Sequence, residues 1–454
     1  MMKVFVSAYA CEPGKGSEPG VGWNWVKQIA RFHEVWVITR LNNRGSIERA
    51  LAKKPMPNVH WIYFDLPFWT RFWKRGQYGV HLYYYFWQIG IYFVAKRLNK
   101  EVRFDVIHHV TFGNYYIPSF LWLLPFPFVW GPVGGGESAP PGFWRSFGLQ
   151  GRTLEIFRDL GRTFTTIDPI TRYVARKASL AIAATEQTAT RLVRLGTRKV
   201  VVWPQVGMNN EQIRYFSTFR IQNPLPFRII SIGRLIHWKG FHLSLEAFAR
   251  FQKIYPDTEY WFVNDGPEVV KLKKIAGNLI TQNKVVFWGK LPALKDVYEK
   301  LNQCHVLVHP ALHEAFGNVC LEAMAAGRPV ICLDLGGPAI QVTKGTGFKV
   351  SAVTPEQVVN DLASAMLKLA QDSELRIRMG EAGRKRVAEH FSWDKKGEMI
   401  SQVYKEIVSK NTKSTDIPVI ASEASAQHPP DNAADQPRTL AENGGSAVSG
   451  GEAI

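Results

Sequence analysis

The sequence predicts an α/β protein with two doubly wound domains, each built on a parallel sheet, and a disordered carboxyl-terminal tail. Three observations carry this prediction. Short apolar runs alternate with helical patterns along most of the 454 residues, which is typical of parallel strands joined by crossover helices. A polar, proline-containing stretch at 206–226 divides these runs into two groups. From residue 411 the composition shifts to Ala, Ser, Gly, Pro and Asn, which indicates disorder.

Ten apolar runs are strand candidates, too many for one small sheet. In chain order they read KVFVSAY, EVWVIT, DVIHHV, LAIAAT, KVVVWP, RIISIG, YWFVND, KVVFWG, HVLVHP and PVICLD. The segment FHLSLEAFARF, between the sixth and seventh runs, places Phe241, Leu245, Phe248 and Phe251 on one stripe. This spacing predicts a helix that packs on a sheet.

These signals divide the chain into four parts. We expect a first domain over residues 1–205, a second over 206–394, a helix over 395–410 that returns to the first domain, and the tail over 411–454. In doubly wound folds, ligands bind outside the carboxyl ends of the strands. A ligand is therefore expected in the cleft between the two domains.

The charge balance points to an anionic partner. The chain has 56 basic and 38 acidic residues, a net charge of +18, and the body without the acidic tail is near +22. The four cysteines lack the close pairing of zinc or disulfide frameworks and are expected in the core. The start, MMKVFVSAYAC, resembles a short signal sequence but is better interpreted as a first buried strand. No apolar stretch is long and clean enough to span a membrane.

Chemistry-bearing residues in the first half follow strand candidates. The loop GKGSEPGVGW has Gly16, Gly20 and Gly22, which would let backbone approach a ligand, and it also carries Glu18. The run DVIHHV ends at a histidine pair, His108 and His109, and the loop WGPVGGGES carries Glu137. Taken alone, such residues are more often satisfied core or surface groups.

Residues 66–104 are crowded with aromatic side chains and carry seven basic residues against one acid. One interpretation is an interfacial surface that docks on anionic lipid and presents a lipid-linked acceptor. The other is a helical pair packed on the first sheet, with its aromatics in the core. The alternation of basic and aromatic residues in WTRFWKR favours the membrane interpretation.

Two clusters in the second half suggest a binding site. In IISIGRLIHWKGF, Gly233 and Arg234 end a strand and Lys239 precedes a helix, a combination of cations suited to a diphosphate. In HPALHEAFGNVCLEAMAAGRPVICLD, Glu314 lies in a loop after a strand and Glu322 lies inside a helix expected from about Asn318 to Ala326. The helix amino terminus suits an anionic or hydroxyl-rich ligand. Two exposed glutamates beside a capped helix are the alternative.

Together these clusters resemble the retaining glycosyltransferases of family 4, which have the GT-B fold. The resemblance covers nearly all of residues 1–410. Further matches are GKGSEPGVGWNWVKQIA near the start, the NDGP turn at 264–267, the GGPAIQV loop at 336–342 and GTGFKV at 345–350. In combination these motifs are highly specific for the family.

The resemblance implies roles for individual residues. Arg234 and Lys239 would neutralise the diphosphate of a nucleotide-sugar donor, Glu314 would bond hydroxyls of the transferred sugar, and Glu322 would bind the ribose. His109 aligns with the histidine that approaches the anomeric centre. The donor-binding set further comprises Gly16, Gly20, Gly22, Gly233, Phe316, Gly317, Asn318 and Val319. The first domain would hold the acceptor, with Glu18, His108 and Glu137 on that side.

The expected activity is transfer of a sugar, with retention, to a glycan or lipid-linked acceptor in surface polysaccharide or glycolipid biosynthesis. No Asp-x-Asp motif is evident, so we expect catalysis without a metal or cofactor, by an enzyme that is cytoplasmic and peripheral on the inner face of the plasma membrane. A GT-B sugar-nucleotide epimerase, a catalytically dead scaffold and a basic nucleic-acid-binding protein are the alternatives. The last lacks a recognisable RNA-binding signature or zinc module.

Overall fold

The computed structural model describes residues 1–70, 79–220 and 226–411. These described residues belong to one compact unit. The predicted tail at 411–454 and the basic-aromatic WTRFWKR stretch fall largely outside the described residues.

The amino-terminal lobe is built on a seven-stranded parallel sheet with the order β3-β2-β1-β4-β5-β6-β7. Its strands are β1 (Lys3–Ala8), β2 (Glu34–Arg40), β3 (Val59–Phe64), β4 (Val106–Thr111), β5 (Phe128–Val133), β6 (Leu180–Ala183) and β7 (Val200–Val202). Its helices are α1 (Ser17–Ala30), α2 (Arg44–Lys53), α3 (Val80–Val102), α4 (Leu149–Ile167), α5 (Pro169–Lys177) and α6 (Glu186–Arg194). The first strand candidate is therefore a strand, buried at the centre of the sheet.

The second lobe is built on a six-stranded parallel sheet with the order β10-β9-β8-β11-β12-β13. Its strands are β8 (Phe227–Ile232), β9 (Thr258–Val263), β10 (Val285–Gly289), β11 (Val306–His309), β12 (Val330–Leu333) and β13 (Gly347–Val350). Its helices are α7 (Asn210–Ser217), α8 (Phe241–Ile254), α9 (Val269–Ala276), α10 (Asn278–Thr281), α11 (Leu294–Asn302), α12 (Asn318–Ala325), α13 (Gly336–Gln341), α14 (Pro355–Gln371) and α15 (Ser373–His390). Two doubly wound α/β lobes confirm the predicted fold class.

Both faces of each sheet are buried, as parallel sheets require. In β8, Ile229 packs into one core cluster and Ile230 into the other, because successive strand residues point to opposite faces. The predicted stripe on α8 is confirmed: its four aromatic and leucine side chains lie in the core with Ile229. All four cysteines are buried and free.

Besides the connection from β7 to α7, two described segments reach from one lobe into the core of the other. α16 (Trp393–Asn411) follows α15 and lies against α1, where Trp393 packs edge-on against Trp25. The second crossing has no signal in the sequence. The 3-10 helix η4 (Pro141–Ser146) follows β5, yet Phe143 and Phe147 lie in the core of the second lobe.

The polar stretch at 206–226 is more ordered than a plain linker. Within its described part, α7 begins at a capping box in which Asn209 and Gln212 exchange hydrogen bonds with each other's backbone. No helix among the described ranges is both long and apolar enough to cross a membrane.

Candidate active site

The candidate site lies at the carboxyl ends of β8 and β11, which are neighbours at the point where the strand order of the second sheet reverses. Connections on the two sides of this point run in opposite directions, so the loops separate and leave room for a ligand. Gly233 follows β8, and His309 ends β11. In the first sheet the corresponding point lies between β1 and β4. The glycine-rich segment follows β1, whereas His109, predicted at the end of a strand, is the fourth of the six residues of β4.

Lys239 and Glu314, 75 positions apart in the chain, are in direct contact. The Lys239 ammonium donates to Glu314 Oε2, and His309 Nε2 lies 3.5 Å from the same oxygen. The side chains of Lys239 and Glu314 are only 15% and 14% exposed. Burial alone would raise the pKa of Glu314, but the hydrogen bond with His309 and the charge of Lys239 outweigh it and hold this pKa below its usual range. Glu314 is therefore an anion at neutral pH.

Backbone geometry brings these loops together. Lys239 ends the short 3-10 helix η5 (His237–Lys239), and Gly240 follows in the left-handed region at φ 67°. A Cβ at Gly240 would lie 2.1 Å from the carbonyl oxygen of Pro310, so only glycine allows the loop after β8 to approach the end of β11. This close approach places Lys239 beside Glu314.

The loop of Glu314 is also held by α13. The Gly337 amide donates to the carbonyl oxygen of Glu314 at 2.8 Å, and the Gln341 side chain donates to the carbonyl oxygen of Phe316. The Phe316 amide in turn donates to Glu314 Oε1 at 3.3 Å. The GGPAIQV motif thus fixes the position of the Glu314 carboxylate.

The helix α12 begins immediately after this loop. Gly317 has φ 62°, and Asn318 and Val319 open the helix. Amides in a first helical turn have no intrahelical acceptor and carry the positive end of the helix dipole. The turn therefore presents donor groups to the same region as Lys239 and Glu314.

Glu322 lies one turn further along α12. It accepts a hydrogen bond of 3.2 Å from the Tyr298 hydroxyl, and burial raises its pKa to about 7. Glu314 and Glu322 therefore differ electrostatically: Glu314 is held charged, whereas Glu322 titrates near neutrality.

Arg234 is exposed and forms no ion pair within the described ranges. Its loop is held by the NDGP turn, since the Leu235 amide donates to the Asp265 carbonyl oxygen at 2.9 Å and Gly266 packs directly on Leu235. The guanidinium is free to meet a ligand above the end of β8.

In the first lobe, only Gly16 lies in the predicted loop, whereas Glu18, Gly20 and Gly22 lie inside α1, which begins at Ser17. A Cβ at Gly20 or Gly22 would lie 2.0 Å from the Lys15 carbonyl oxygen or 2.1 Å from that of Ala10, whereas Gly16 has open space around it. Close packing within the chain therefore accounts for two of the three glycines. Glu18 Oε1 accepts from the Gly113 amide at 3.1 Å, and burial raises the pKa of Glu18.

The paired histidines point to opposite faces of the first sheet. His109 is fully buried beside Tyr84, whose hydroxyl lies 3.2 Å from Nε2, and burial with the neighbouring His108 lowers its pKa to about 3. His108 contacts the Tyr404 hydroxyl at 2.5 Å and the Gly131 carbonyl oxygen at 2.6 Å. In this arrangement His108 joins the sheet to α16, and we do not place it among acceptor-side residues.

Glu137 is buried and accepts hydrogen bonds from Thr185 at 2.6 Å, from Thr188 at 2.8 Å and from the Gly135 amide at 2.9 Å. These bonds hold the loop after β5. The same loop meets the second lobe, since a Cβ at Gly134 would lie 3.6 Å from the Ala315 side chain. The loops of Glu137 and Glu314 are therefore neighbours across the lobes.

Two residues that contact the predicted carboxylates were not predicted as site residues. His309 appeared only as the end of a strand and Tyr298 not at all, yet they contact Glu314 and Glu322. A histidine at the carboxyl end of the strand before an acidic loop is a usable signal for the first. Tyr298 lies on α11, and nothing local marks it.

The second lobe matches a known family. Residues 219–386 match the profile described as Glycosyl transferases group 1. The lipopolysaccharide core biosynthesis glycosyltransferase LpsE of Rhizobium meliloti (strain 1021) is 33% identical over 165 residues, covering 36% of this chain and 45% of its own length. The D-inositol 3-phosphate glycosyltransferase of Corynebacterium jeikeium (strain K411) is 33% identical over 196 residues, covering 40% and 45%. The chain thus spans less than half the length of these curated relatives.

Solved structures share the fold over most of the described chain. The Anabaena protein HepE, in complex with UDP and glucose, aligns with a TM-score of 0.55 at 18% identity over 89% of this chain and 100% of its own. Sucrose-phosphate synthase of Thermosynechococcus elongatus aligns with a TM-score of 0.58 at 17% identity over 90% and 100%. At such identity the likeness shows the fold alone. The chain has the two-lobed GT-B fold, and its residues 219–386 are similar to the glycosyl transferases group 1.

Proposed function

We propose that this protein transfers a sugar, with retention, from a nucleotide-sugar donor to a glycan or lipid-linked glycan. The contact of Lys239 with Glu314, beside His309 and the first turn of α12, carries the proposal. It places a cation, a fixed anion and backbone donors at one switch point of a parallel sheet, where a donor's phosphates and sugar would lie together.

In this proposal, Glu314 and Lys239 bind different parts of the donor. Glu314, held ionised, would accept hydrogen bonds from hydroxyls of the transferred sugar. Lys239, which neutralises Glu314 in the free protein, would turn to the diphosphate together with the exposed Arg234. These cations stabilise the charge that develops on the leaving diphosphate, so the proposed catalysis needs no metal ion.

Glu322 would receive the ribose hydroxyls at the other end of the donor. Its raised pKa suits a group that is protonated in part without ligand and that becomes a charged acceptor when two hydroxyls donate to it. The eight positions between Glu314 and Glu322 thus separate one carboxylate for each sugar of the donor.

For the reaction we propose front-face transfer. The acceptor oxygen bonds to the anomeric carbon on the face from which the diphosphate leaves, the bond from that carbon to the phosphate oxygen breaks, and the acceptor proton passes to this oxygen. Glu18, in the first turn of α1, and His109, inside β4, lie in the first lobe, on the proposed acceptor side. With a low pKa, His109 is neutral and would add no positive charge beside the anomeric centre.

The relatives support the substrate class. HepE was solved with UDP and glucose, and LpsE is named for lipopolysaccharide core biosynthesis. We therefore propose a nucleotide-sugar donor and an acceptor in surface polysaccharide or glycolipid biosynthesis. With such an acceptor, the proposed enzyme would act at the inner face of the plasma membrane.

The first experiment is a thermal-shift screen of UDP-, GDP-, ADP- and CMP-sugars with and without magnesium, because a ligand stabilises the fold that binds it. With the donor found, Lys239→Ala and Glu314→Ala are each expected to lower kcat/KM for transfer by about 100-fold or more. Lys274→Ala and Glu389→Ala remove the same charges from exposed positions and should transfer normally.

Transfer at the normal rate by either site variant would remove that residue from the site. Epimerised donor in the absence of acceptor would identify an epimerase instead. A folded protein that no donor stabilises would overturn the proposal.

A further inference from the structure

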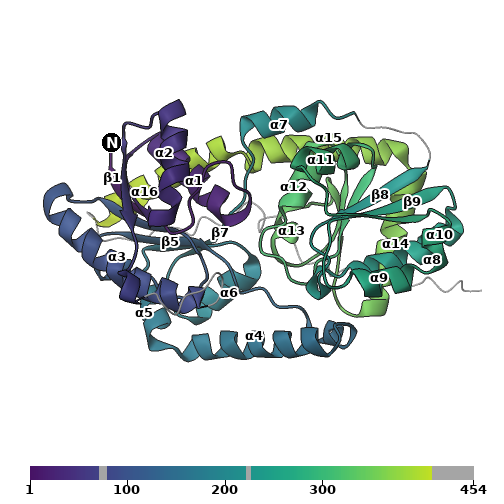
Figure 1. The fold of residues 1–454 in the computed structure, drawn as a ribbon, viewed down its shortest axis with the longest axis horizontal. Coiled ribbons are helices and arrows are strands. Elements are labelled where there is room, and N and C mark those ends of the chain that lie inside the picture. The colour runs from purple at the N-terminus through teal and green to yellow at the C-terminus, as the bar shows by residue number, and fades with distance from the viewer. Residues whose placement is uncertain (71–78, 221–225, 412–454) are drawn as a thin grey trace, which may run out of the picture. The chain divides into compact units, whose positions relative to one another are not determined.

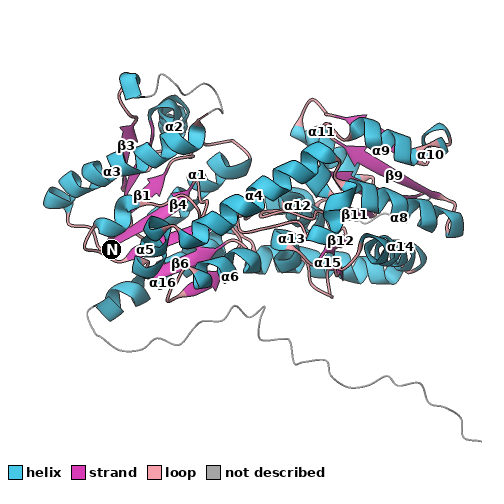
Figure 2. Ribbon diagram, turned by 90° about the horizontal axis from the view of Figure 1, so that it is seen from below, coloured by secondary structure: helices cyan, strands magenta, loops and turns pink. Residues whose placement is uncertain are grey.

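Helix α4 presents its apolar side to solvent. Leu154, Phe157, Leu160, Phe164 and Ile167 follow one another at intervals of three or four residues, so they share one face of the helix. All five are exposed, and Phe157, Phe164 and Ile167 are 65–67% exposed. In Figure 1 α4 runs along the lower edge beneath both lobes, and Figure 2, seen from below, shows it uncovered in front.

The inward side of α4 is polar. Glu155 and Arg162 are buried, and Arg162 donates to the Gly135 carbonyl oxygen at 3.2 Å. Glu155 Oε1 lies 3.5 Å from His237 Nε2 in the second lobe, and Arg158 stacks over Trp238. This polarity is the reverse of that expected for a helix on a soluble protein, which buries its apolar face. The apolar face is therefore a surface that something covers.

The charges around this face are of one sign. Between residues 145 and 177 the exposed charged side chains are Arg145, Arg152, Arg176 and Lys177. The acids of the same stretch are all bonded: Glu155 accepts from Arg158, Asp159 from Arg162, and Asp168 from the Thr171 amide. An apolar stripe edged by exposed cations complements an anionic lipid surface. A second copy of the chain would bring like charges together.

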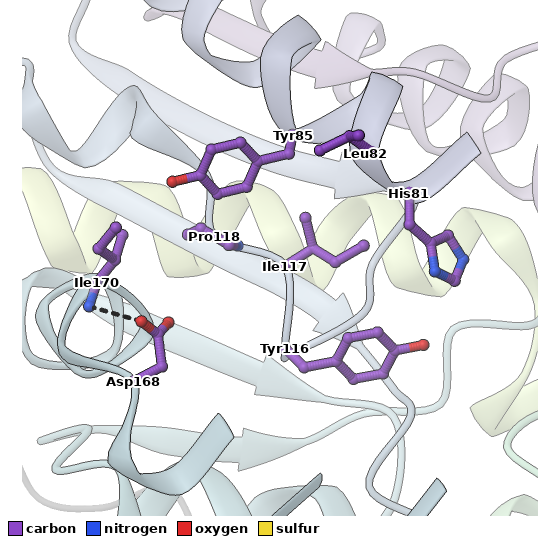
Figure 3. Close-up of a pocket in the computed structure, with 8 residues that line it drawn as sticks. All are labelled: His81, Leu82, Tyr85, Tyr116, Ile117, Pro118, Asp168 and Ile170. Atoms are coloured by element: carbon purple, nitrogen blue, oxygen red, sulfur yellow. Dashed lines mark hydrogen bonds between the residues drawn. The ribbon is translucent and has the colours of Figure 1, made fainter. Parts of the chain in front are cut away.

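A pocket of about 460 Å³ opens where α4 ends. Figure 3 shows Asp168 and Ile170, just beyond α4, on one side of the pocket. Opposite them lie the loop after β4, with Tyr116, Ile117 and Pro118, and the beginning of α3. The walls are largely apolar and aromatic, and Leu82 at the rim is itself exposed. The apolar surface thus continues from α4 toward the loops of the first lobe, which hold the proposed acceptor side.

We propose that α4 docks this protein on an anionic bilayer, with its apolar face at the boundary between headgroups and acyl chains. The polar face of α4 touches both lobes, so docking sets the cleft against the membrane at the height of a lipid-linked acceptor. Only this last consequence rests on the proposed glycosyl transfer. The docking surface itself follows from the side chains of α4.

The test is flotation of the full chain with vesicles of phosphatidylglycerol and phosphatidylcholine, and with phosphatidylcholine alone. The double variant F157Q/F164Q is expected to lower partition onto anionic vesicles by about tenfold or more. Arg152→Glu should weaken binding to anionic vesicles and leave binding to neutral ones unchanged. Val270→Gln, an exposed apolar side chain of the second lobe, is the matched control. Phe93→Gln tests the exposed side of α3.

Three outcomes would overturn the docking surface: no partition of the folded wild-type chain, equal partition of F157Q/F164Q, or loss only with Phe93→Gln. A concentration-dependent dimer abolished by F157Q/F164Q would assign the face to a second copy instead. Thermal shift with the donor should be unchanged in F157Q/F164Q. Vesicle binding without any donor shift would refute the proposed function and leave the docking surface standing.

Discussion

At the scale of single residues, the carboxylates of Glu314 and Glu322 have different environments. Glu314 is paired with a lysine and a histidine, whereas the side-chain partner of Glu322 among the described residues is a neutral tyrosine hydroxyl. A cation lowers the pKa of a carboxyl group, and burial without one raises it. The same residue type therefore holds a fixed charge at one position and a titrating one at the other.

Donor affinity should depend on pH through Glu322. If ribose hydroxyls donate to its carboxylate, the donor binds the ionised form, so Kd falls as pH rises through about 7. Between about pH 6 and about pH 8 we expect up to about tenfold tighter binding. Calorimetric titration checks this, and Glu322→Gln should bind weakly with no such pH dependence. A wild-type Kd that is constant with pH would contradict the role of Glu322.

In the free protein, the contribution of Glu322 to stability should change with pH in the opposite direction: it falls as pH rises. The pKa of Glu322 is higher in the fold than the ordinary 4.5, so the folded state binds the extra proton between these values. The contribution of Glu322 to the free energy of unfolding is therefore full below 4.5 and declines as pH rises toward 7.

At the scale of elements, the secondary structure was largely predictable because its signals are local. All ten strand candidates are strands, and the helix expected from Asn318 is α12. Three strands were missed for physical reasons. β3 is an edge strand with partly exposed residues, β5 contains Gly131 and Pro132, and β13 begins at Gly347 and contains Lys349. None forms a long apolar run.

The core and membrane interpretations of residues 66–104 apply to different faces of α3. In its described part, α3 buries Tyr83, Tyr84 and Trp87, as a helix on a sheet would. Its opposite side leaves Phe86 and Phe93 exposed. The core interpretation accounts for one face of α3, and the membrane interpretation of the other stays a prediction.

The loop that carries Lys239 depends on one glycine. Gly240→Ala is expected to destabilise the fold by about 2 kcal/mol or more, because a Cβ there meets the Pro310 carbonyl and disfavours the positive φ. Gly161→Ala, in the middle of α4 with nothing within 4 Å, should instead stabilise by about 0.5–1 kcal/mol. Urea unfolding measures both. Equal effects of the two substitutions would show that the contact with Pro310 is not what requires glycine.

At the scale of the whole molecule, the lobes share a core. One continuous apolar cluster runs from Val4 in the first sheet to Val330 in the second, and includes Trp393, Ile400 and Tyr404 around α16. Because α16 follows α15 directly and packs on α1, it ties the two sheets together. We therefore expect both lobes to unfold in one transition.

Neighbouring residues of α16 allow a matched test. Ile400 is fully buried and Met399 is 49% exposed. Ile400→Ala should cost about 2–4 kcal/mol and lower the Tm of both lobes, whereas Met399→Ala should change stability by less than about 0.5 kcal/mol. Thermal unfolding followed by circular dichroism and by donor protection reports on the whole chain and on the second lobe. Separate transitions in the Ile400→Ala variant would mean that the lobes are independent.

The sequence by itself determined the alternation of strands and helices, the two lobes, and the loop and helix that carry Glu314 and Glu322, because each depends on neighbours in the chain. Only the tertiary structure decided which partners these residues have. Lys239 meets Glu314 because β8 and β11 are neighbours, and His108 turns to α16 while His109 does not. The same holds for α4: periodicity shows that a helix has two faces, but packing alone decides which one meets the protein.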